Sequence, residues 1–388
     1  MRDADGRVKV SILLMHAYGM GGTIRTTLNV AAHLAQRHDV EIVSVLRRRT
    51  KPFFPFPPGV RVTQLDDLEH GRAALWRAGR RLLVGHPSVL THEQDYAYAA
   101  SSLWTDLLLL LRLRRARGIV IATRPSLNLI VARHAPSRVV TIGQEHMHFH
   151  SHRDRLAEAI RRDYPRLDVL TVLSRADLED YRTRLGPHGP RVVRIPNAVE
   201  PSPDGRSERT APLVVAAGRL TRQKGFDLLV RAFEKVAAER PSWRLRIYGD
   251  GRKRQDLQDQ IEAAGLLGVV ELAGSTDQLG AELSKGTIFV LSSRFEGFGM
   301  VLIEAMSKGL AVVSFDCPQG PGEIITDGED GILVAPGDVD GLAAAIVRLI
   351  DDEQQRHRLG TKALSTAAQY DLAVIGRQWD ELVGRLIP

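Results

Sequence analysis

Short apolar runs of strand length alternate with amphipathic stretches of helix length along nearly the whole chain. The runs in the first half are V8-K-V-S-I-L-L-M15, V40-E-I-V-S-V45, G118-I-V-I-A122, R138-V-V-T-I142 and D168-V-L-T-V172. Strands that alternate with helices indicate parallel sheets, because each parallel connection needs a long crossover that covers one face of the sheet. The pattern therefore predicts the α/β fold class with doubly wound sheets.

The alternation stops at one polar segment and starts again beyond it. Residues 200–212, E-P-S-P-D-G-R-S-E-R-T-A-P, are rich in proline, serine and charge, as domain linkers are. The later strand-like runs are L213-V-V-A-A217, W243-R-L-R-I-Y248, V269-V-E-L-A273, I288-F-V-L291 and A311-V-V-S-F315. A chain of 388 residues is also too long for one ordinary core. We expect domains at residues 1–200 and 201–370, with a C-terminal helix at 371–388 that packs back toward the first domain.

Cysteine usage and hydropathy bear on the cellular location. The single cysteine, Cys317, excludes an internal disulfide and favours a reducing compartment. The N-terminal apolar stretch is too short for a signal peptide. The longest apolar run, residues 103–113, is too short to span a bilayer, and we interpret it as a buried helix. These features predict a cytoplasmic protein, with the inner face of the plasma membrane as an alternative location.

The net charge of +7 is carried by clustered arginines at 47–49, 77–81 and 112–117. Such clusters attract phosphorylated substrates, anionic lipid or nucleic acid, although solvated helix faces carry similar charge. The segment L75-W-R-A-G-R-R-L-L-V84 resembles an interfacial helix, and a core-packing helix with a basic outer face explains it equally well. With 5% aromatic residues and no recognised motif, the chain is not expected to bind nucleic acid.

Two motifs of the second half place charge and glycine at strand ends. In G218-R-L-T-R-Q-K-G225, Arg219 and Lys224 follow a strand and precede a helix. Two cations beside a helix N-terminus favour an anion site suited to a diphosphate, and a solvated loop is the alternative. The glycines of Y248-G-D-G-R-K253 favour a tight turn.

The segment R294-F-E-G-F-G-M-V-L-I-E-A-M-S-K-G309 holds two glutamates. We expect Glu296 in a glycine-rich loop and Glu304 in the first turns of the helix that follows. Backbone amides near Gly299 suit phosphate, whereas ionised acids accept hydrogen bonds from hydroxyl groups. Together these groups indicate a nucleotide-sugar site. The alternative is that Glu296 caps the helix and Glu304 lies on its solvent face.

Three further motifs were weighed for other chemistries. The glycine loop A17-Y-G-M-G-G-T23 lacks the third glycine of a dinucleotide fingerprint, so hydride transfer is disfavoured. In G143-Q-E-H-M-H-F-H-S-H152 the alternating histidines suggest zinc, but an ordinary loop between a strand and a helix is favoured. The D-x-D pairs Asp3/Asp5 and Asp338/Asp340 occupy a free terminus and a helix start, where capping explains the second pair better. No metal ion is expected.

At this point the chain resembles a known family. The stretch G218-R-L-T-R-Q-K-G-F-D-L-L229, the Glu296/Glu304 pair and I195-P-N-A-V199 are similar, in the same order, to the retaining family 4 glycosyltransferases. The resemblance spans most of the chain. It implies the GT-B fold, with two Rossmann-like domains that face an interdomain cleft, the donor held by the second domain and the acceptor by the first.

The resemblance also assigns roles to residues. Arg219 and Lys224 would contact the donor diphosphate, Glu304 the ribose hydroxyls and Glu296 the transferred sugar. The remaining donor-binding positions would be Gly21, Gly22, Gly218, Gly274, Phe298, Gly299, Met300 and Val301. The catalytic set would be His146, Arg219, Lys224 and Glu296. Arg124 and Glu145 would bind the acceptor, with Glu145 as an alternative orienting group for His146.

The expected activity is a retaining, hexosyl-type transfer from a UDP- or GDP-sugar to an acceptor hydroxyl, with no cofactor. Residues 313–325 resemble a branch that builds bacterial envelope polymers, so the acceptor is expected to be anionic or lipid-linked, with a secondary metabolite as an alternative. A nucleotide-sugar epimerase of the same architecture is the main rival, and a nucleic-acid binder a weaker one. The cations and helix amides would stabilise charge on the leaving diphosphate, as a metal does in other enzymes.

Overall fold

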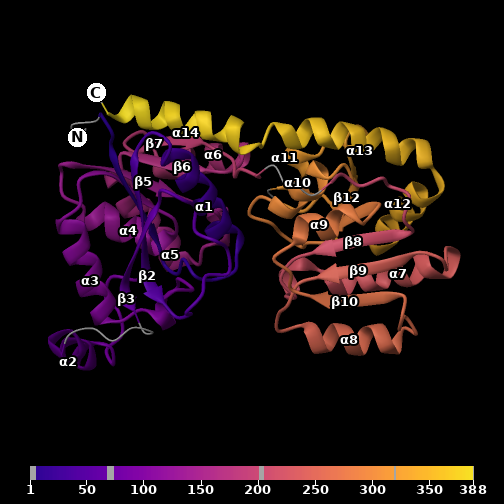
Figure 1. Ribbon diagram of the computed structural model, residues 1–388, viewed down its shortest axis with the longest axis horizontal. Helices are drawn as coiled ribbons and strands as arrows, with labels where there is room; N and C mark the ends of the chain where they lie inside the picture. The colour runs from indigo at the N-terminus through magenta and orange to yellow at the C-terminus, as the bar shows by residue number, and fades with distance from the viewer. Residues whose placement is uncertain (1–5, 68–73, 201–204, 319, 388) are drawn as a thin grey trace. The chain divides into compact units, whose positions relative to one another are not determined.

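The computed structural model describes residues 6–67, 74–200, 205–318 and 320–387. It divides into two compact units, one of residues 1–198 with 375–388 and one of residues 199–374. Each unit is built on one parallel sheet with its own helices (Figure 1).

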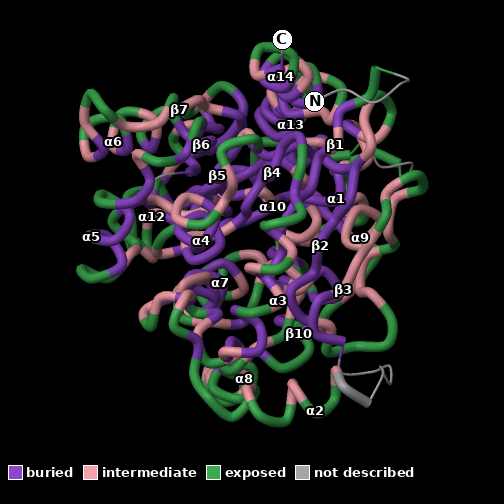
Figure 2. The backbone as a smooth tube through the Cα atoms, turned by 90° about the vertical axis from the view of Figure 1, so that its left-hand side faces the viewer, coloured by how far each residue is buried: buried purple, intermediate pink, exposed green. Residues whose placement is uncertain are grey.

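The first unit holds a seven-stranded sheet in the order β3-β2-β1-β4-β5-β6-β7. Its strands are β1 Lys9–Leu14, β2 Asp39–Arg47, β3 Arg61–Asp67, β4 Gly118–Ala122, β5 Val139–Gln144, β6 Val169–Val172 and β7 Arg191–Arg194. Its helices are α1 Gly22–Leu34, α2 Ala74–Leu83, α3 Leu103–Arg114, α4 Pro125–His134, α5 Asp154–Asp163 and α6 Arg175–Leu185, and it includes α14 Leu372–Leu386 from Ile375 onward. The central strands are buried along their whole length, as Figure 2 shows for β4.

The second unit holds a six-stranded sheet in the order β10-β9-β8-β11-β12-β13. Its strands are β8 Leu213–Ala217, β9 Arg244–Tyr248, β10 Val270–Gly274, β11 Ile288–Leu291, β12 Ala311–Phe315 and β13 Ile332–Val334. Its helices are α7 Phe226–Glu239, α8 Arg254–Ala263, α9 Leu279–Ser284, α10 Met300–Ser307, α11 Pro321–Ile324, α12 Val339–Asp351 and α13 Glu353–Ala368. Helix α7 packs against α8 and α12, and α10 packs against α9 and α13, so the helices form two groups.

Both sheets have the strand order of a doubly wound fold. The direction of winding reverses between β1 and β4 in the first sheet and between β8 and β11 in the second. In open α/β sheets ligands bind beyond the carboxyl ends of the strands at such a reversal. The loops after β1, β4, β8 and β11 are therefore the places where a site is expected.

One helix differs from its sequence-based interpretation, and a second fits the core-packing alternative that was left open for it. In α3, Trp104, Leu109 and Leu113 are buried, but Leu107 and Leu111 are 38% and 40% exposed, so only one face of the expected buried helix lies in the core. In α2, the expected basic helix, Trp76 packs edge-on against Trp104 at 5.3 Å and Arg80 pairs with Asp66 at 2.9 Å. Leu82, on the same helix, remains 73% exposed.

Candidate functional site

Two loops at the reversal point of the second sheet carry most of the predicted donor residues. The first runs from Gly218 to Gly225, between β8 and α7, and the second runs from Ser292 to Gly299, between β11 and α10. Strands β8 and β11 are paired in parallel, so their carboxyl ends lie side by side. This pairing brings together two motifs that are about 70 residues apart in the sequence.

A buried ion pair joins the two loops. Lys224 Nζ lies 2.6 Å from Glu296 Oε1, and the side chains are only 16% and 6% exposed. The Ser293 hydroxyl donates to the same carboxylate oxygen. Burial, with the negative charge of Glu296 as the next cause, raises the pKa of the Cys317 thiol to about 12. A buried carboxylate is stable only when it is paired and hydrogen-bonded, so these contacts fix the position of Glu296.

Backbone contacts hold the same two loops against each other. Gly225 has a φ of 63°, and a Cβ atom there would lie 2.0 Å from the Ser292 carbonyl oxygen. The Ser292 hydroxyl donates to the Lys224 carbonyl at 3.0 Å, and the Arg294 amide donates to the Gln223 carbonyl at 2.8 Å. Only glycine permits both this φ and this approach. The Lys224 loop and the Glu296 loop therefore form one structural piece.

Three glycines line the carboxyl ends of β8, β9 and β10. The Gly218 amide donates to the Tyr248 carbonyl at 2.9 Å, and the Gly249 amide donates to the Gly274 carbonyl at 2.7 Å. A Cβ atom at Gly249 would lie 1.9 Å from the Gly218 carbonyl oxygen. Arg219, directly after Gly218, is exposed and forms no ion pair with any residue in the described ranges. For Gly249 the sequence favours a tight turn over close approach to a ligand, although its motif follows a strand just as Gly218 does.

Helix α10 points its N-terminus at this edge. Gly299 is its N-cap with a φ of 92°, and Met300 and Val301 form its first turn. The first amides of a helix have no partner within the helix, so they are available to an anion. The Phe298 ring is 3% exposed and meets the Tyr370 ring edge to face at 5.7 Å, so the ring lies in the interior of the second unit. Glu296 lies in the loop and the half-buried Glu304 in the helix, as the sequence predicts.

In the first unit, Gly21 and Gly22 begin α1 after β1. No atom lies within 4 Å of a Cβ built on either residue. The space over this turn is therefore open to a ligand, as the prediction for these two residues requires. Gly21 is the N-cap, so the amides of the first turn of α1 face the same opening.

His146 follows β5 and has an unusual environment. Both ring nitrogens are enclosed and lack a hydrogen-bond partner among the described residues, although part of the side chain remains exposed. Burial lowers the pKa of this histidine to about 4. The ring is therefore neutral at ordinary pH, with one nitrogen able to accept a hydrogen bond.

Glu145 lies in the interior of the first unit. It is 2% exposed, and its Oε1 accepts hydrogen bonds from the Tyr164 hydroxyl and from Asn128 Nδ2, the latter at 3.0 Å. Its Oε2 lies 3.6 Å from His152 Nε2. These contacts hold the carboxylate within the core, which argues against the predicted direct contact with an acceptor. They also join it to His152 rather than to His146.

Arg124 lies between β4 and α4 and is already paired. Its Nη2 lies 2.6 Å from Asp95 Oδ1, and Asp95 is 2% exposed at its side chain. The second oxygen of Asp95 accepts the Ser126 amide at 3.0 Å, at the start of α4. The pair therefore fixes the β4–α4 turn, and much of the charge that Arg124 would offer an acceptor is neutralised.

The structure also bears on the motifs weighed for metal. Residues 149–151 form a 3-10 turn, so the four histidines of 146–152 do not alternate along one extended strand. No group of three metal-binding side chains occurs within the residues that the structure describes. Asp338 accepts the Gly341 amide at 2.8 Å as the cap of α12, as expected. Asp3 and Asp5 lie outside the described residues.

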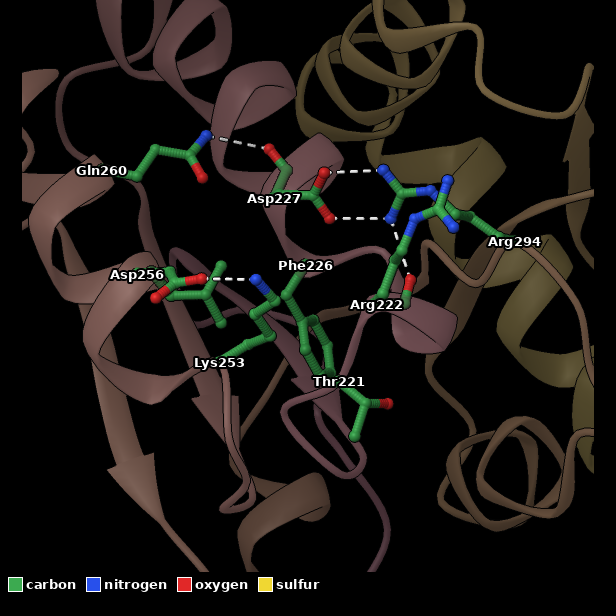
Figure 3. Close-up of a pocket in the computed structure, with 9 residues that line it drawn as sticks. Thr221, Arg222, Phe226, Asp227, Lys253, Asp256, Gln260 and Arg294 are labelled. Carbon is green, nitrogen blue, oxygen red and sulfur yellow. Dashed lines mark hydrogen bonds and ion pairs between the residues drawn. The ribbon is translucent and has the colours of Figure 1, made fainter.

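A pocket of about 250 Å³ lies on the α8 side of the Lys224 loop (Figure 3). It is lined by Thr221, Arg222, Phe226, Asp227, Lys253, Asp256, Leu257, Gln260 and Arg294. None of the predicted donor residues lines it. Its wall contains a bidentate ion pair, in which Arg294 donates hydrogen bonds to both carboxylate oxygens of Asp227, at 2.8 and 2.6 Å. Arg294 also donates to the Arg222 carbonyl at 2.9 Å, so it ties the Glu296 loop to the start of α7.

Sequence comparison connects most of the second unit to a known family, nearly the whole chain to one bacterial relative and just over half of it to another. Residues 202–366 match the family of glycosyl transferases group 1. The exopolysaccharide phosphotransferase of Streptomyces coelicolor is 36% identical over 390 residues, a match that covers 98% of this chain and 41% of the relative. The poly(glycerol-phosphate) alpha-glucosyltransferase of Bacillus subtilis is 28% identical over 235 residues, or 57% of this chain and 33% of that protein. The chain thus spans less than half of the length of either relative.

Solved structures share the fold. TarM of S. aureus, in a crystal structure with fondaparinux, alpha-GlcNAc-glycerol and UDP, superposes with a TM-score of 0.78 at 16% identity, over 97% of this chain and 99% of that one. Anabaena HepE in complex with UDP-glucose gives a TM-score of 0.73 at 19% identity, over 98% of this chain and 100% of that one. In the described ranges no helix combines the length and the hydropathy that a membrane span requires. Residues 202–366 are therefore similar to the group 1 glycosyl transferases, and the two Rossmann-like units give the chain the GT-B fold.

Proposed function

We propose that the chain is a retaining glycosyltransferase that moves a sugar from a nucleotide-diphosphate sugar to an acceptor hydroxyl. The observation that carries the proposal is the buried Lys224–Glu296 pair at the reversal point of the second sheet. An ion pair that only stabilises the fold does not require glycines at the strand ends, an exposed arginine without an ion-pair partner, and a helix N-terminus beside it. A donor with a diphosphate and a hydroxylated sugar needs all of them.

The proposed roles follow from charge. Arg219, Lys224 and the amides at the start of α10 face the diphosphate, which gains negative charge as the anomeric C–O bond breaks. Glu296 accepts from a hydroxyl of the transferred sugar while it holds Lys224 in position. Glu304 accepts from the ribose hydroxyls, and Gly274 leaves room for the base. The neutral His146 accepts or donates a hydrogen bond near the reacting sugar.

The donor and acceptor classes are part of the same proposal. The UDP in the TarM structure and the UDP-glucose in the HepE structure support a UDP-sugar as the first donor to test. The named relatives act on exopolysaccharide and poly(glycerol-phosphate), which supports an anionic envelope polymer as the acceptor. Front-face attack assisted by the leaving phosphate accounts for retention, and the two cations take the place of a metal ion.

A thermal-shift screen of UDP-, GDP-, ADP- and TDP-sugars tests the donor site. One donor at 100 times its dissociation constant is expected to raise the melting temperature by about 5 °C or more. The variants Arg219→Ala and Glu304→Ala are expected to abolish the shift. Arg222→Ala is the matched control, because this exposed arginine lies three residues further along the same loop. The proposal fails if no donor stabilises the protein or if all three variants respond alike.

Product analysis separates glycosyl transfer from its rivals. Glycosyl transfer releases a nucleoside diphosphate in proportion to glycosylated acceptor. Transfer of a sugar phosphate, which the name of the Streptomyces relative raises, breaks the diphosphate and releases a nucleoside monophosphate. An epimerase releases the free sugar and nucleoside diphosphate without any acceptor. Nucleoside monophosphate, or turnover independent of acceptor, would therefore contradict the proposal.

A further inference from the structure

Positive charge is concentrated in the segment that begins with Arg47, the last residue of β2, at the carboxyl edge of the first sheet. Residues 47–58, R-R-R-T-K-P-F-F-P-F-P-P, contain four cations, three phenylalanines, four prolines and no acid. We call these twelve residues the post-β2 loop. None of these twelve residues is among the predicted donor-binding residues.

One arginine of the post-β2 loop has a structural role, because its guanidinium group binds other residues of the protein. Arg47 pairs with Asp67 at 3.2 Å and donates to the carbonyls of Arg49 and Thr50 at 3.2 and 2.9 Å. Its guanidinium also lies over the Tyr18 ring at 4.9 Å. The loop is therefore wrapped around Arg47, whose own charge is neutralised by Asp67.

The other three cations of the loop are accessible to a ligand. Arg48, Arg49 and Lys51 are exposed, and no acid in the described part of the chain forms an ion pair with any of them. Burial is the main cause that lowers the pKa of His16. The positive charges of Arg48 and Arg49 lower it further. His16 is the second residue after β1, so both guanidinium groups act on the part of the sheet edge where a substrate is expected.

Contacts join the post-β2 loop to the glycine turn. The Phe53 amide donates to the Tyr18 carbonyl at 3.3 Å, and the Phe56 and Tyr18 rings meet edge to face at 5.1 Å. Arg25, in the first turn of α1 after Gly22, lies over the Phe54 ring at 6.0 Å. Because β1 and β2 are parallel neighbours, the glycine turn and this loop share one edge of the sheet.

We propose that the post-β2 loop binds phosphate groups carried along the acceptor, so that the acceptor is a phosphate-bearing glycan or polyol chain. Arg48, Arg49 and Lys51 contact the phosphates, and the half-buried phenylalanine rings contact the apolar faces of the sugar or polyol units. The prolines limit the freedom that the loop loses on binding. This inference rests on the proposed function, because it names the substrate class of the same enzyme.

The test compares two variants with the same change in net charge. The loop variant carries Arg48→Gln, Arg49→Gln and Lys51→Gln. The control carries Arg114→Gln, Arg115→Gln and Arg117→Gln, which are also exposed but precede β4 at the opposite edge of the same sheet. Binding is measured by calorimetry with a glycerol phosphate oligomer, with vesicles of phosphatidylglycerol, and with a neutral maltooligosaccharide, at low and high salt. The UDP-sugar thermal shift is recorded for every variant.

The loop variant is expected to bind the glycerol phosphate oligomer about tenfold more weakly and with a weaker dependence on salt, because three exposed ion pairs are lost. The control is expected to bind like the parent protein, and neither variant is expected to change the UDP-sugar shift. A loss seen only with vesicles would show that the three cations bind lipid headgroups, and it would overturn the assignment of the loop to the acceptor.

Equal weakening in both variants, or parental binding by the loop variant, overturns the inference. If the UDP-sugar shift is absent in the parent while phosphate binding still depends on the loop, the proposed function fails and the loop assignment stands. If the shift is present and the loop variant binds normally, only the loop assignment fails.

Discussion

At the scale of single residues, the Lys224–Glu296 pair sets the properties of the candidate site. Both side chains are largely withdrawn from water, so each requires the other as a partner. Lys224→Met would leave the carboxylate buried with only the Ser293 hydroxyl, and it is expected to lower the free energy of unfolding by about 3 kcal/mol. Glu296→Gln removes the charge and keeps a hydrogen-bonding group.

The double variant Lys224→Met/Glu296→Gln is expected to recover most of that stability, because no unpaired charge remains. Urea unfolding of the four proteins in this cycle measures the coupling. A double variant that is as unstable as the sum of its parents would show that the two groups are not coupled. Neither single variant is expected to show a donor-induced thermal shift.

The enclosed His146 predicts a dependence of stability on pH. Its pKa in the folded protein, about 4, lies below the ordinary value of 6.5, so the unfolded chain binds the proton more readily. The histidine therefore costs nothing above pH 6.5 and destabilises the fold as the pH falls from 6.5 toward 4, by up to about 3 kcal/mol.

His146→Gln is expected to remove this dependence. The free energy of unfolding is measured in urea. As the pH falls from 6.5 to 4, it should decrease less in the variant than in the parent protein. His188→Gln, at an exposed position, is the control and should follow the parent. Parallel curves for His146→Gln and the parent would show that the ring is not held neutral.

The residues that the sequence did not reveal are those whose meaning depends on a partner far along the chain. Ser293 is recognisable only once its hydroxyl is seen on Glu296, and Asp227 only once it faces Arg294. The motif residues Arg219, Lys224 and Glu304 could be predicted as site residues because each lies in a motif that is recognisable within a few positions. Glu145 shows the reverse error, since a polar residue after a strand was interpreted as a ligand contact and lies in the core.

At the scale of elements, the edges of the sheets were hardest to predict. The strands absent from the sequence-based expectation are β3, β7 and β13, and each lies at the edge of its sheet. Edge strands are short and partly exposed, as in R191-V-V-R194, so they lack the continuous apolar run that marks a central strand. The strand order itself is set by contacts between distant segments, and no local pattern contains it.

The contact between Asp227 and Arg294 joins two elements that carry the site. Asp227→Ala would remove one of the contacts that hold the Glu296 loop, the two hydrogen bonds from Arg294, and it is expected to lower kcat/KM about tenfold, mainly through kcat, because Glu296 is positioned less precisely. The loss of stability is expected to stay below about 1 kcal/mol, because both side chains are partly exposed.

Arg294 lowers the pKa of Asp227, so this small contribution is present at neutral pH and is lost as the pH falls through the acid range. Asp351→Ala is the matched control, because Asp351 accepts two hydrogen bonds from Arg240 in the same way, away from the site loops. If both variants changed kcat/KM equally, the contact between Asp227 and Arg294 would have no specific role in positioning Glu296.

At the scale of the whole molecule, each unit has its own core. The two clusters of buried apolar side chains share no residue, and each lies within one unit. The repeated alternation of strands and helices was enough to predict two α/β units. The C-terminal helix expected at 371–388 to pack toward the first domain corresponds to α14, which belongs to the first unit from Ile375 onward.

Helix α14 completes the first unit although it follows the second in sequence. Trp379 is 1% exposed, Asp380 lies 3.0 Å from His33 of α1, and a Cβ atom at Gly376 would lie 2.4 Å from the His33 ring. Trp379→Ala is expected to destabilise the first unit by about 3 kcal/mol through the cavity that it leaves. Hydrogen exchange measured by mass spectrometry should then rise in peptides of β1 to β7 and stay unchanged in peptides of β8 to β13.

Trp243→Ala provides the reciprocal case, because Trp243 belongs to the core of the second unit. It should raise exchange in β8 to β13 only, and it should weaken the stabilisation by a UDP-sugar because the donor residues depend on that unit. Exchange that rises across both sheets in either variant would show that the two cores unfold as one cooperative unit, since independent cores transmit a local cavity no further than their own sheet.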